Sequence, residues 1–280
     1  ILAALICFLL GLVLSGLARI LPGSTIASAV LPIIFLVSYV LTYQQVPTFP
    51  PVGSTNKIFY IALAAALIGF ALDLLPRTAN YRKLLAAITP LLIVGWIGLP
   101  RFAKSDVELM ATALGLWLGG IALLWPLDTV AASRAEQNGG SIVGTAMLMA
   151  LLLAFAPVAL LGGSSTSLML CLAAVAGLAA TVLWELVVPR NAFSASAVFG
   201  VGCGLLAMID TVTLITREVD LVALALLLLI PYAGEVSARL LLPQNRFRGR
   251  VRQVLVGTFA ASPILLVMAV LLLRHRESMS

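Results

Sequence analysis

The chain has 280 residues, of which 62% are hydrophobic and only 10% are charged, with a formal net charge of +6. Its mean hydropathy of +1.14 excludes an ordinary soluble domain. Its basic residues lie between apolar segments, where membrane topology signals are found, and they do not indicate a nucleic-acid surface. Only helices and closed barrels satisfy their backbone groups in lipid, and the sequence lacks the alternating pattern of barrel strands. We therefore predict an all-α polytopic transmembrane helical bundle.

Proline, glycine and charged residues divide the sequence into about ten segments of transmembrane length. In chain order we expect spans at 1–20, 25–43, 57–75, 84–99, 107–125, 141–161, 168–188, 192–215, 221–242 and 253–273. The first segment ends in Ala18-Arg19 and not in a cleavage site, so we interpret it as a true span that lacks its extreme N-terminus. The fourth segment is short enough to be re-entrant, which leaves about eight or nine crossings as the alternative.

A break at residues 138–140, near the middle of the chain, suggests two similar halves. Prolines recur about 140 residues apart on its two sides, Pro47 with Pro189 and Pro90 with Pro231. We predict a single integral membrane domain built from an N-terminal half, 1–137, and a C-terminal half, 141–280, each of about five helices. An odd number of helices per half would invert the second half across the membrane, as in many secondary transporters. The alternative is that evenly spaced hairpins produce this spacing without a repeat.

The distribution of basic residues predicts the orientation of the bundle. One side of the predicted membrane domain collects Arg19, Arg77, Arg82, Lys83, Arg134, Arg190, Arg239, Arg246, Arg248, Arg250 and Arg252. The other side collects Lys57, Arg101, Lys104, Arg217, Arg274 and Arg276. Because basic loops favour the cytoplasm, we expect the first side to be cytoplasmic and both termini to lie on the opposite side. We expect the membrane to be a bacterial cytoplasmic (inner) membrane.

Asp210 is the sharpest candidate for a functional residue. It lies in an apolar segment with no basic residue before Arg217. Ionisable residues at membrane depth are costly and mark functional sites. A carboxylate without a partner in hydrocarbon takes up a proton, which suits proton coupling. The alternative is a neutral carboxyl group bonded to Thr211, Thr213 or a neighbouring backbone.

Glu235 and Arg239 are four residues apart on the predicted ninth span and share one helix face. Both residues come after Pro231 and Gly234 in the sequence. We expect Pro231 and Gly234 to interrupt the helix. Interrupted helices expose carbonyl groups that bind ions or substrates in transporters. We therefore name Glu235 and Arg239 as candidates for a transport pathway. The alternative is a pair that neutralises itself and attaches the helix to a neighbour.

Other charged residues lie near the expected cytoplasmic ends of their spans. Asp73 and Glu185 are pathway candidates, and the alternative for each is an interfacial ion pair with a neighbouring arginine. The cluster of Arg246, Arg248, Arg250 and Arg252 is a candidate for binding lipid headgroups, and the alternative is a topology signal alone. Two small-xxx-small patterns, Gly115 with Gly119 and Gly200 with Gly204, predict close helix packing.

The sequence contains no constellation of catalytic residues. Cys7, Cys171 and Cys203 lie in apolar segments without metal-binding spacing, and His275 is the single histidine. We therefore expect no catalytic residue, no metal and no cofactor. The leading hypothesis is a secondary transporter of a small solute in the lipid bilayer, and Asp210 suggests that transport is coupled to protons. The alternative is a non-catalytic subunit or assembly factor that packs against partner transmembrane helices, and an intramembrane enzyme acting on lipid is the third.

Overall fold

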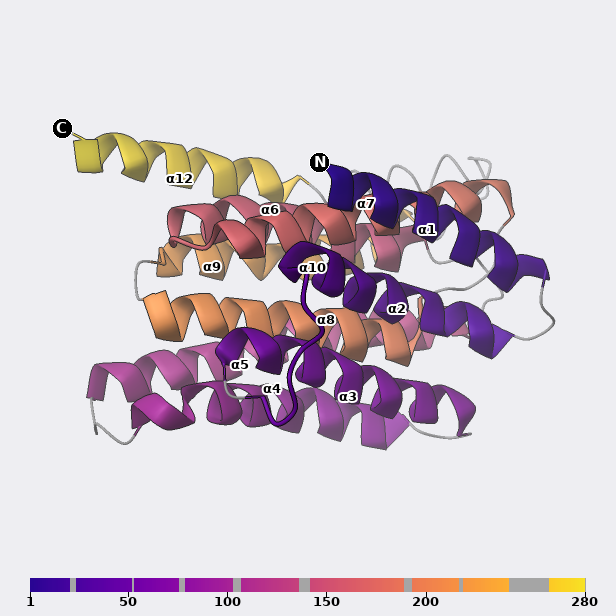
Figure 1. Ribbon diagram of the computed structural model, residues 1–280, viewed down its shortest axis with the longest axis horizontal. Coiled ribbons are helices and arrows are strands. Elements are labelled where there is room, and N and C mark those ends of the chain that lie inside the picture. Colours follow the sequence, from indigo (N-terminus) through magenta and orange to yellow (C-terminus); the bar gives the residue numbers. More distant parts are fainter. Residues whose placement is uncertain are drawn as a thin grey trace.

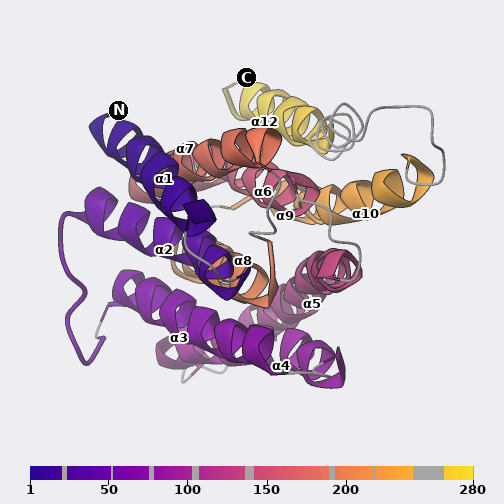
Figure 2. The same ribbon diagram turned by 90° about the vertical axis from the view of Figure 1, so that its right-hand side faces the viewer.

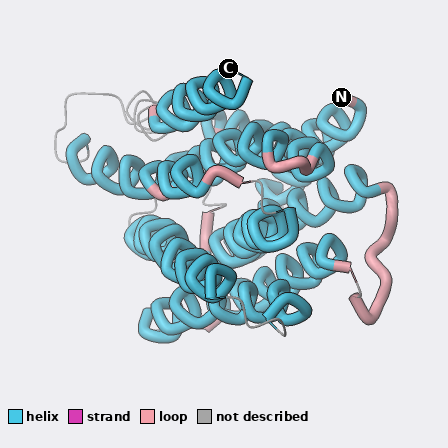
Figure 3. Tube along the Cα trace, turned by 90° about the vertical axis from the view of Figure 1, so that its left-hand side faces the viewer, coloured by secondary structure: helices cyan, strands magenta, loops and turns pink. Residues whose placement is uncertain are grey.

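The computed structural model describes residues 1–20, 24–51, 53–75, 79–102, 107–135, 142–188, 193–216, 219–241 and 262–279. Within these ranges the chain is helical apart from short connections, and it contains no strand (Figure 3). The helices run side by side along the long axis of the molecule (Figure 1). This arrangement is the one that satisfies backbone hydrogen bonds in lipid.

The helices follow the apolar segments of the sequence. In the first part of the chain they are α1 (Leu2–Ile20), α2 (Ser24–Tyr43), α3 (Ser54–Leu74), α4 (Ala79–Phe102) and α5 (Val107–Ala135). The second part has α6 (Ile142–Leu161), α7 (Ser165–Val187), α8 (Ala195–Thr211), the π-helix η1 (Val212–Thr216), α9 (Leu221–Leu227), α10 (Leu229–Leu241) and α12 (Pro263–Met279). Seven of the described segments are long and apolar enough to cross a membrane, namely α1, α3, α4, α5, α6, α7, and α8 continued into η1. The protein therefore belongs to the helical membrane class.

Three helices differ from their predicted bounds. The fourth is not short, because α4 spans 24 residues and includes Pro90. The fifth span continues beyond residue 125, through Pro126 to Ala135, into the polar stretch 126–137 that the sequence offers as a continuation of this helix. The ninth predicted span, 221–242, is divided into α9 and α10. The interruption predicted at Pro231 and Gly234 lies about one turn earlier, at Leu228 between these two helices. A proline ring clashes with the carbonyl four residues before it, which explains this position.

Helix α8 forms the centre of the bundle. Its 17 residues are all buried, and it packs against α2, α3, α4, α5 and α6. The end-on view shows α8 enclosed by its neighbours, with α10 and α12 at the periphery (Figure 2). A Cβ atom at Gly200 would lie 2.6 Å from Cβ of Pro32, so this glycine permits close contact with α2. The close packing predicted for Gly200 is therefore confirmed.

Charged and polar groups cross-link the helices at both ends of the bundle. At one end, Nε of Arg82 lies 2.7 Å from Oδ1 of Asp128, and Nε of Arg19 donates to the Val188 carbonyl at 3.1 Å. At the opposite end, Nζ of Lys57 donates to the Trp96 carbonyl at 2.8 Å. The apolar middle of the bundle lies between these two polar layers.

Candidate functional site

A cleft of about 500 Å³ lies between α5, the end of α8, and the α9–α10 segment. Its described lining is apolar except for Glu108, Thr112 and Asp210. The walls come from both parts of the chain, because α5 precedes the break at residues 138–140 and α8 to α10 follow it. The volume lies within the range of small-molecule sites, which are mostly apolar with a few placed polar groups.

Asp210 provides the buried carboxyl group of this cleft. It is the penultimate residue of α8 and is only 2% exposed, yet it lines the cleft. Within the described part of the chain, its carboxyl group makes no hydrogen bond or ion pair. The π-helix η1 begins two residues later, and such segments are frequent at functional sites. The structure therefore brings the predicted candidate to a cavity and not to a packed interface.

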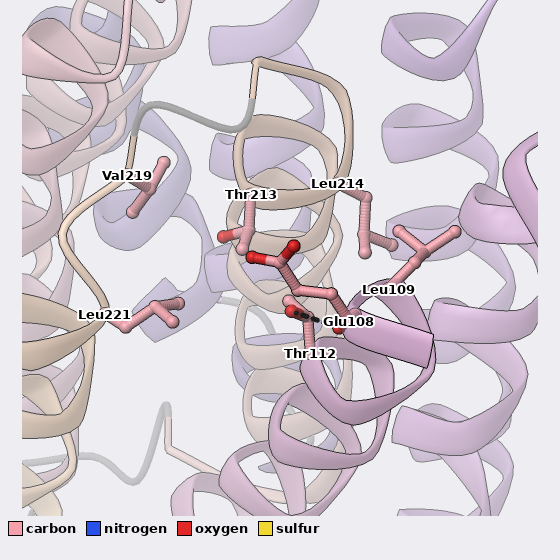
Figure 4. A pocket seen from close by; sticks show the side chains of 7 residues that line it. All are labelled: Glu108, Leu109, Thr112, Thr213, Leu214, Val219 and Leu221. Carbon is pink, nitrogen blue, oxygen red and sulfur yellow. Dashed lines mark hydrogen bonds between the residues drawn. The ribbon is translucent and has the colours of Figure 1, made fainter. Parts of the chain in front are cut away.

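A smaller cavity of about 110 Å³ adjoins the cleft and shares Glu108, Thr112 and Leu221 with it. Figure 4 shows the Glu108 carboxylate and the Thr213 hydroxyl on facing walls of this cavity. The Thr112 hydroxyl donates to the Glu108 carbonyl at 2.9 Å. The Thr213 hydroxyl is buried and has no hydrogen-bond partner among the described residues. The smaller cavity therefore has polar groups at its walls and shares Glu108 and Thr112 with the cleft that Asp210 lines.

The missing side chains of Gly115 and Gly119 keep the cleft open. A Cβ atom at Gly115 would meet no heavy atom within 4 Å, and one at Gly119 would meet only Cδ1 of Leu228 at 4.0 Å. The small-xxx-small face of α5 therefore borders the cleft and is not packed against a described helix. This differs from the packing predicted for these two glycines.

No described basic side chain lines the cleft. The helices around α8 direct their ionisable groups elsewhere: Arg101 of α4 donates to the Ile215 carbonyl at 3.3 Å, Lys57 of α3 to Trp96, and Tyr39 of α2 to the Thr55 carbonyl at 2.9 Å. Helix α6 carries no ionisable residue, and α5 contributes Glu108. The charged groups that share the cleft are thus both acidic.

Asp73 has a structural position. Its two carboxylate oxygens accept hydrogen bonds from the backbone N–H groups of Ala195 and Ser196, at 3.0 and 3.1 Å. These N–H groups belong to the first turn of α8, where no helical partner exists and a negative charge is favourable. Asp73 therefore caps α8, a role that neither the pathway interpretation nor the alternative of an ion pair with a nearby arginine included.

The remaining predicted site residues lie away from the cleft or outside the described chain. Glu185 is buried near the end of α7, and Glu235 is half-buried on α10 without lining the cleft. The Arg239 side chain is not described, so its pairing with Glu235 remains a prediction. Pro231 and Gly234 are both buried in α10. The headgroup candidates Arg246, Arg248, Arg250 and Arg252 lie outside the described residues.

Sequence reasoning missed two groups of residues. Glu108 and Thr112 lie near the start of the fifth predicted span without any local sign of a functional role, and only the packing of α5 near α8 brings them to the cleft that Asp210 lines. The Arg82–Asp128 pair was also missed, although Asp128 lies in the polar continuation of the fifth span and Arg82 precedes the fourth. A search for opposite charges at adjacent ends of antiparallel neighbours would have found this pair.

The described residues contain no group of three or more His, Cys, Asp or Glu side chains arranged to hold a metal ion. Cys7, Cys171 and Cys203 are buried free thiols on separate helices. Neither the protein-family models nor the curated proteins compared with this chain match it.

Proposed function

We propose that this protein is a secondary transporter of a small solute in which proton exchange at Asp210 is coupled to solute movement. The observation that carries the proposal is the position of the Asp210 carboxyl group in a cleft of about 500 Å³ between α5 and α8–α10. Transporters bind substrates and coupling ions at interfaces between the two halves of the chain. A buried acid that only packed the bundle would face another helix and not a cavity.

Proton coupling follows from the cost of a charge in this environment. The carboxyl group is 2% exposed and has no partner among the described residues, so its charged form is costly and no described cation offsets that cost. Binding of a solute or of a proton can relieve this cost, and the two then compete for one group. Glu108, on the facing helix, is the second acidic group that shares the cleft. Such competition links solute movement to the proton gradient.

We propose that the bundle has about ten spans arranged as inverted halves. Support comes from three related contacts: α1 packs on α2 as α6 packs on α7, α4 packs on α5 as α9 packs on α12, and α3 packs on its counterpart α8. Other contacts lack equally large counterparts between the halves: α1 packs on α7, and α8 packs on α2, α4 and α5, without equivalent packing of α6 on α2 or of α3 on α7, α9 and α12 among the described residues. In this proposal the halves are related by an approximate axis that passes between α3 and α8.

We also propose that the end of the bundle with Arg19, Arg82 and Lys83 faces the cytoplasm of a bacterial cell, across its inner membrane. Both termini and the smaller cavity at Glu108 then lie toward the opposite side. The polar links Arg82–Asp128 and Arg19–Val188 hold the helices together at the cytoplasmic end. The described conformation would accordingly receive solute from the outer side.

Uptake into reconstituted vesicles tests the proposal. Vesicles with an inside-acidic pH gradient, from which protons leave as solute enters, are given a defined mixture of amino acids, sugars, nucleosides and quaternary amines, and the accumulated solutes are identified by mass spectrometry. We expect the wild-type protein to accumulate at least one solute, and Asp210→Asn to lose this accumulation while keeping its thermal unfolding profile. Glu235→Gln is the control, because Glu235 does not line the cleft. Equal uptake by wild type and Asp210→Asn would contradict the proposal.

The alternative function, a subunit that packs against a partner helix, is favoured by Gly115 and Gly119. Their small-xxx-small face is open, and such faces bind transmembrane helices. A partner helix would fill the cleft and bring its own backbone against α5. Purification of one stoichiometric partner that is lost in Gly115→Leu would support this alternative, whereas solute accumulation by the isolated chain would exclude it.

A further inference from the structure

We infer that the cleft selects an organic cation with an apolar body, such as a quaternary ammonium or phosphonium compound. This inference rests on the proposed function and names the class of its solute. Three properties of the cleft support this class of solute: its charged groups are acidic, its lining is mostly apolar, and it has open space beside α5. A site for an anion would carry basic groups, and a site for a sugar would carry more polar ones.

The charge of the solute follows from the acidic groups of the cleft. Asp210 and Glu108 line it from facing helices, and no described lysine or arginine side chain joins them. An anion would find no cationic partner there and would be repelled by both carboxylates. A cation would supply the missing counter-charge for Asp210, whose carboxyl group has no described partner. The electrostatics therefore favour a positively charged solute.

The apolar body of the solute follows from the rest of the lining. Apart from Glu108, Thr112 and Asp210, the described walls consist of Leu, Ile, Ala and Gly side chains. A sugar or nucleoside would leave most of its hydroxyl and amide groups without partners in such a cleft. An apolar body would instead bury its surface against these walls and gain the usual hydrophobic free energy.

The glycines of α5 provide the space for this body. Gly115 has open space at its Cβ position and lies in the wall of the cleft. A larger side chain at this position would project into the cleft and occupy the volume needed by the solute. Gly95 of α4 also has open space at its Cβ position but does not line the cleft, so it provides a matched control.

Equilibrium binding of two probes of the same shape and opposite charge tests the inference. The purified full chain in detergent is titrated with tetraphenylphosphonium and, separately, with tetraphenylborate. We expect saturable binding of the cation alone, weakened by roughly tenfold or more in Asp210→Asn and in Gly115→Leu, and unchanged in Gly95→Leu. We also expect cation binding to weaken as the pH falls, because protonation of Asp210 removes its charge.

The outcomes separate this inference from the proposed function. Binding of neither probe, equal binding of both, or cation binding unchanged in Asp210→Asn would overturn the cation class. If pH-driven uptake of another solute still depended on Asp210, the transport proposal would stand without this inference. The converse result is cation binding that requires Asp210 while no solute is taken up in response to a pH gradient. That result would support the cation-binding site and overturn the transport proposal. Wild-type-like unfolding profiles of the variants exclude misfolding as the cause.

Discussion

Asp73 of α3 and Ser196 of α8 are joined by a hydrogen bond of 3.1 Å, in which the carboxylate accepts from the backbone N–H. The second carboxylate oxygen accepts from the N–H of Ala195, so Asp73 caps the helix that carries Asp210. Gly69 brings the two helices close, because a Cβ atom there would lie 2.6 Å from the Ala195 carbonyl oxygen. The cap at the start of α8 and Asp210 near its end thus lie at opposite ends of one helix.

Replacement of Asp73 tests this cap. We expect Asp73→Ala to destabilise the protein by about 0.5–2 kcal/mol, since two N–H groups lose their acceptor. Asp73→Asn keeps an oxygen acceptor without the charge and should lose less. Thermal unfolding in detergent measures both variants. An unchanged midpoint in Asp73→Ala would show that the cap does not contribute to stability.

The Arg82–Asp128 pair should be costly to break from one side. Both side chains are about nine-tenths buried, with relative exposures of 11% and 9%. Removal of one partner from a buried pair costs about 3–5 kcal/mol, because the other charge remains buried alone. We therefore expect Arg82→Ala and Asp128→Ala each to unfold at a much lower temperature, and the double alanine variant to lose less than the sum of the two. Additive effects in this cycle would argue against direct coupling.

The hydrogen bond between Ser15 of α1 and Thr181 of α7 should contribute little. Its oxygen atoms are 3.0 Å apart in a buried contact. Side-chain hydrogen bonds between membrane helices average about 0.6 kcal/mol, because the separated helices find other partners. We expect Ser15→Ala to shift the unfolding midpoint only slightly. A loss comparable with that of Arg82→Ala would contradict this expectation.

Glycines of α8 and α5 should respond differently to enlargement. Gly200→Leu would place a side chain where Cβ of Pro32 already lies 2.6 Å from the Cβ position, and such overpacking costs about 1–3 kcal/mol or more. Gly115→Leu meets open space and should fold as the wild type does. The yield of monodisperse protein after solubilisation compares the two variants. Equal yields would show that α8 is not confined as described.

The class of the fold could be predicted from the sequence because hydropathy is a local property. The same local reasoning predicted that Asp210 is a buried acidic residue, since its apolar neighbours and the absence of a nearby basic residue are visible in the sequence, while its functional role remains a prediction. It also predicted the close contact at Gly200. These features depend on residues that adjoin in the chain.

The cleft and the cap could not be predicted in this way. Thr112 and Gly115 come to the same cavity as Asp210 only through the arrangement of α5, α8 and α9. The role of Asp73 requires that α3 pack against α8, and no sequence signal specifies which helices are neighbours. The π-helix η1 likewise has no recognisable signature among Val, Thr, Leu and Ile residues. The number of spans and the inverted repeat remain predictions.

The central claim is that water and solutes reach the cleft at Asp210, and thiol labelling tests it most directly. Gly115→Cys places a thiol in the cleft, Gly95→Cys places one in open space elsewhere, and the buried native cysteines provide a low background. With a membrane-impermeant methanethiosulfonate reagent applied to reconstituted vesicles, we predict that Gly115→Cys reacts about tenfold faster than Gly95→Cys, since thiolates form only where water enters. Equally slow reaction at both positions would contradict the account.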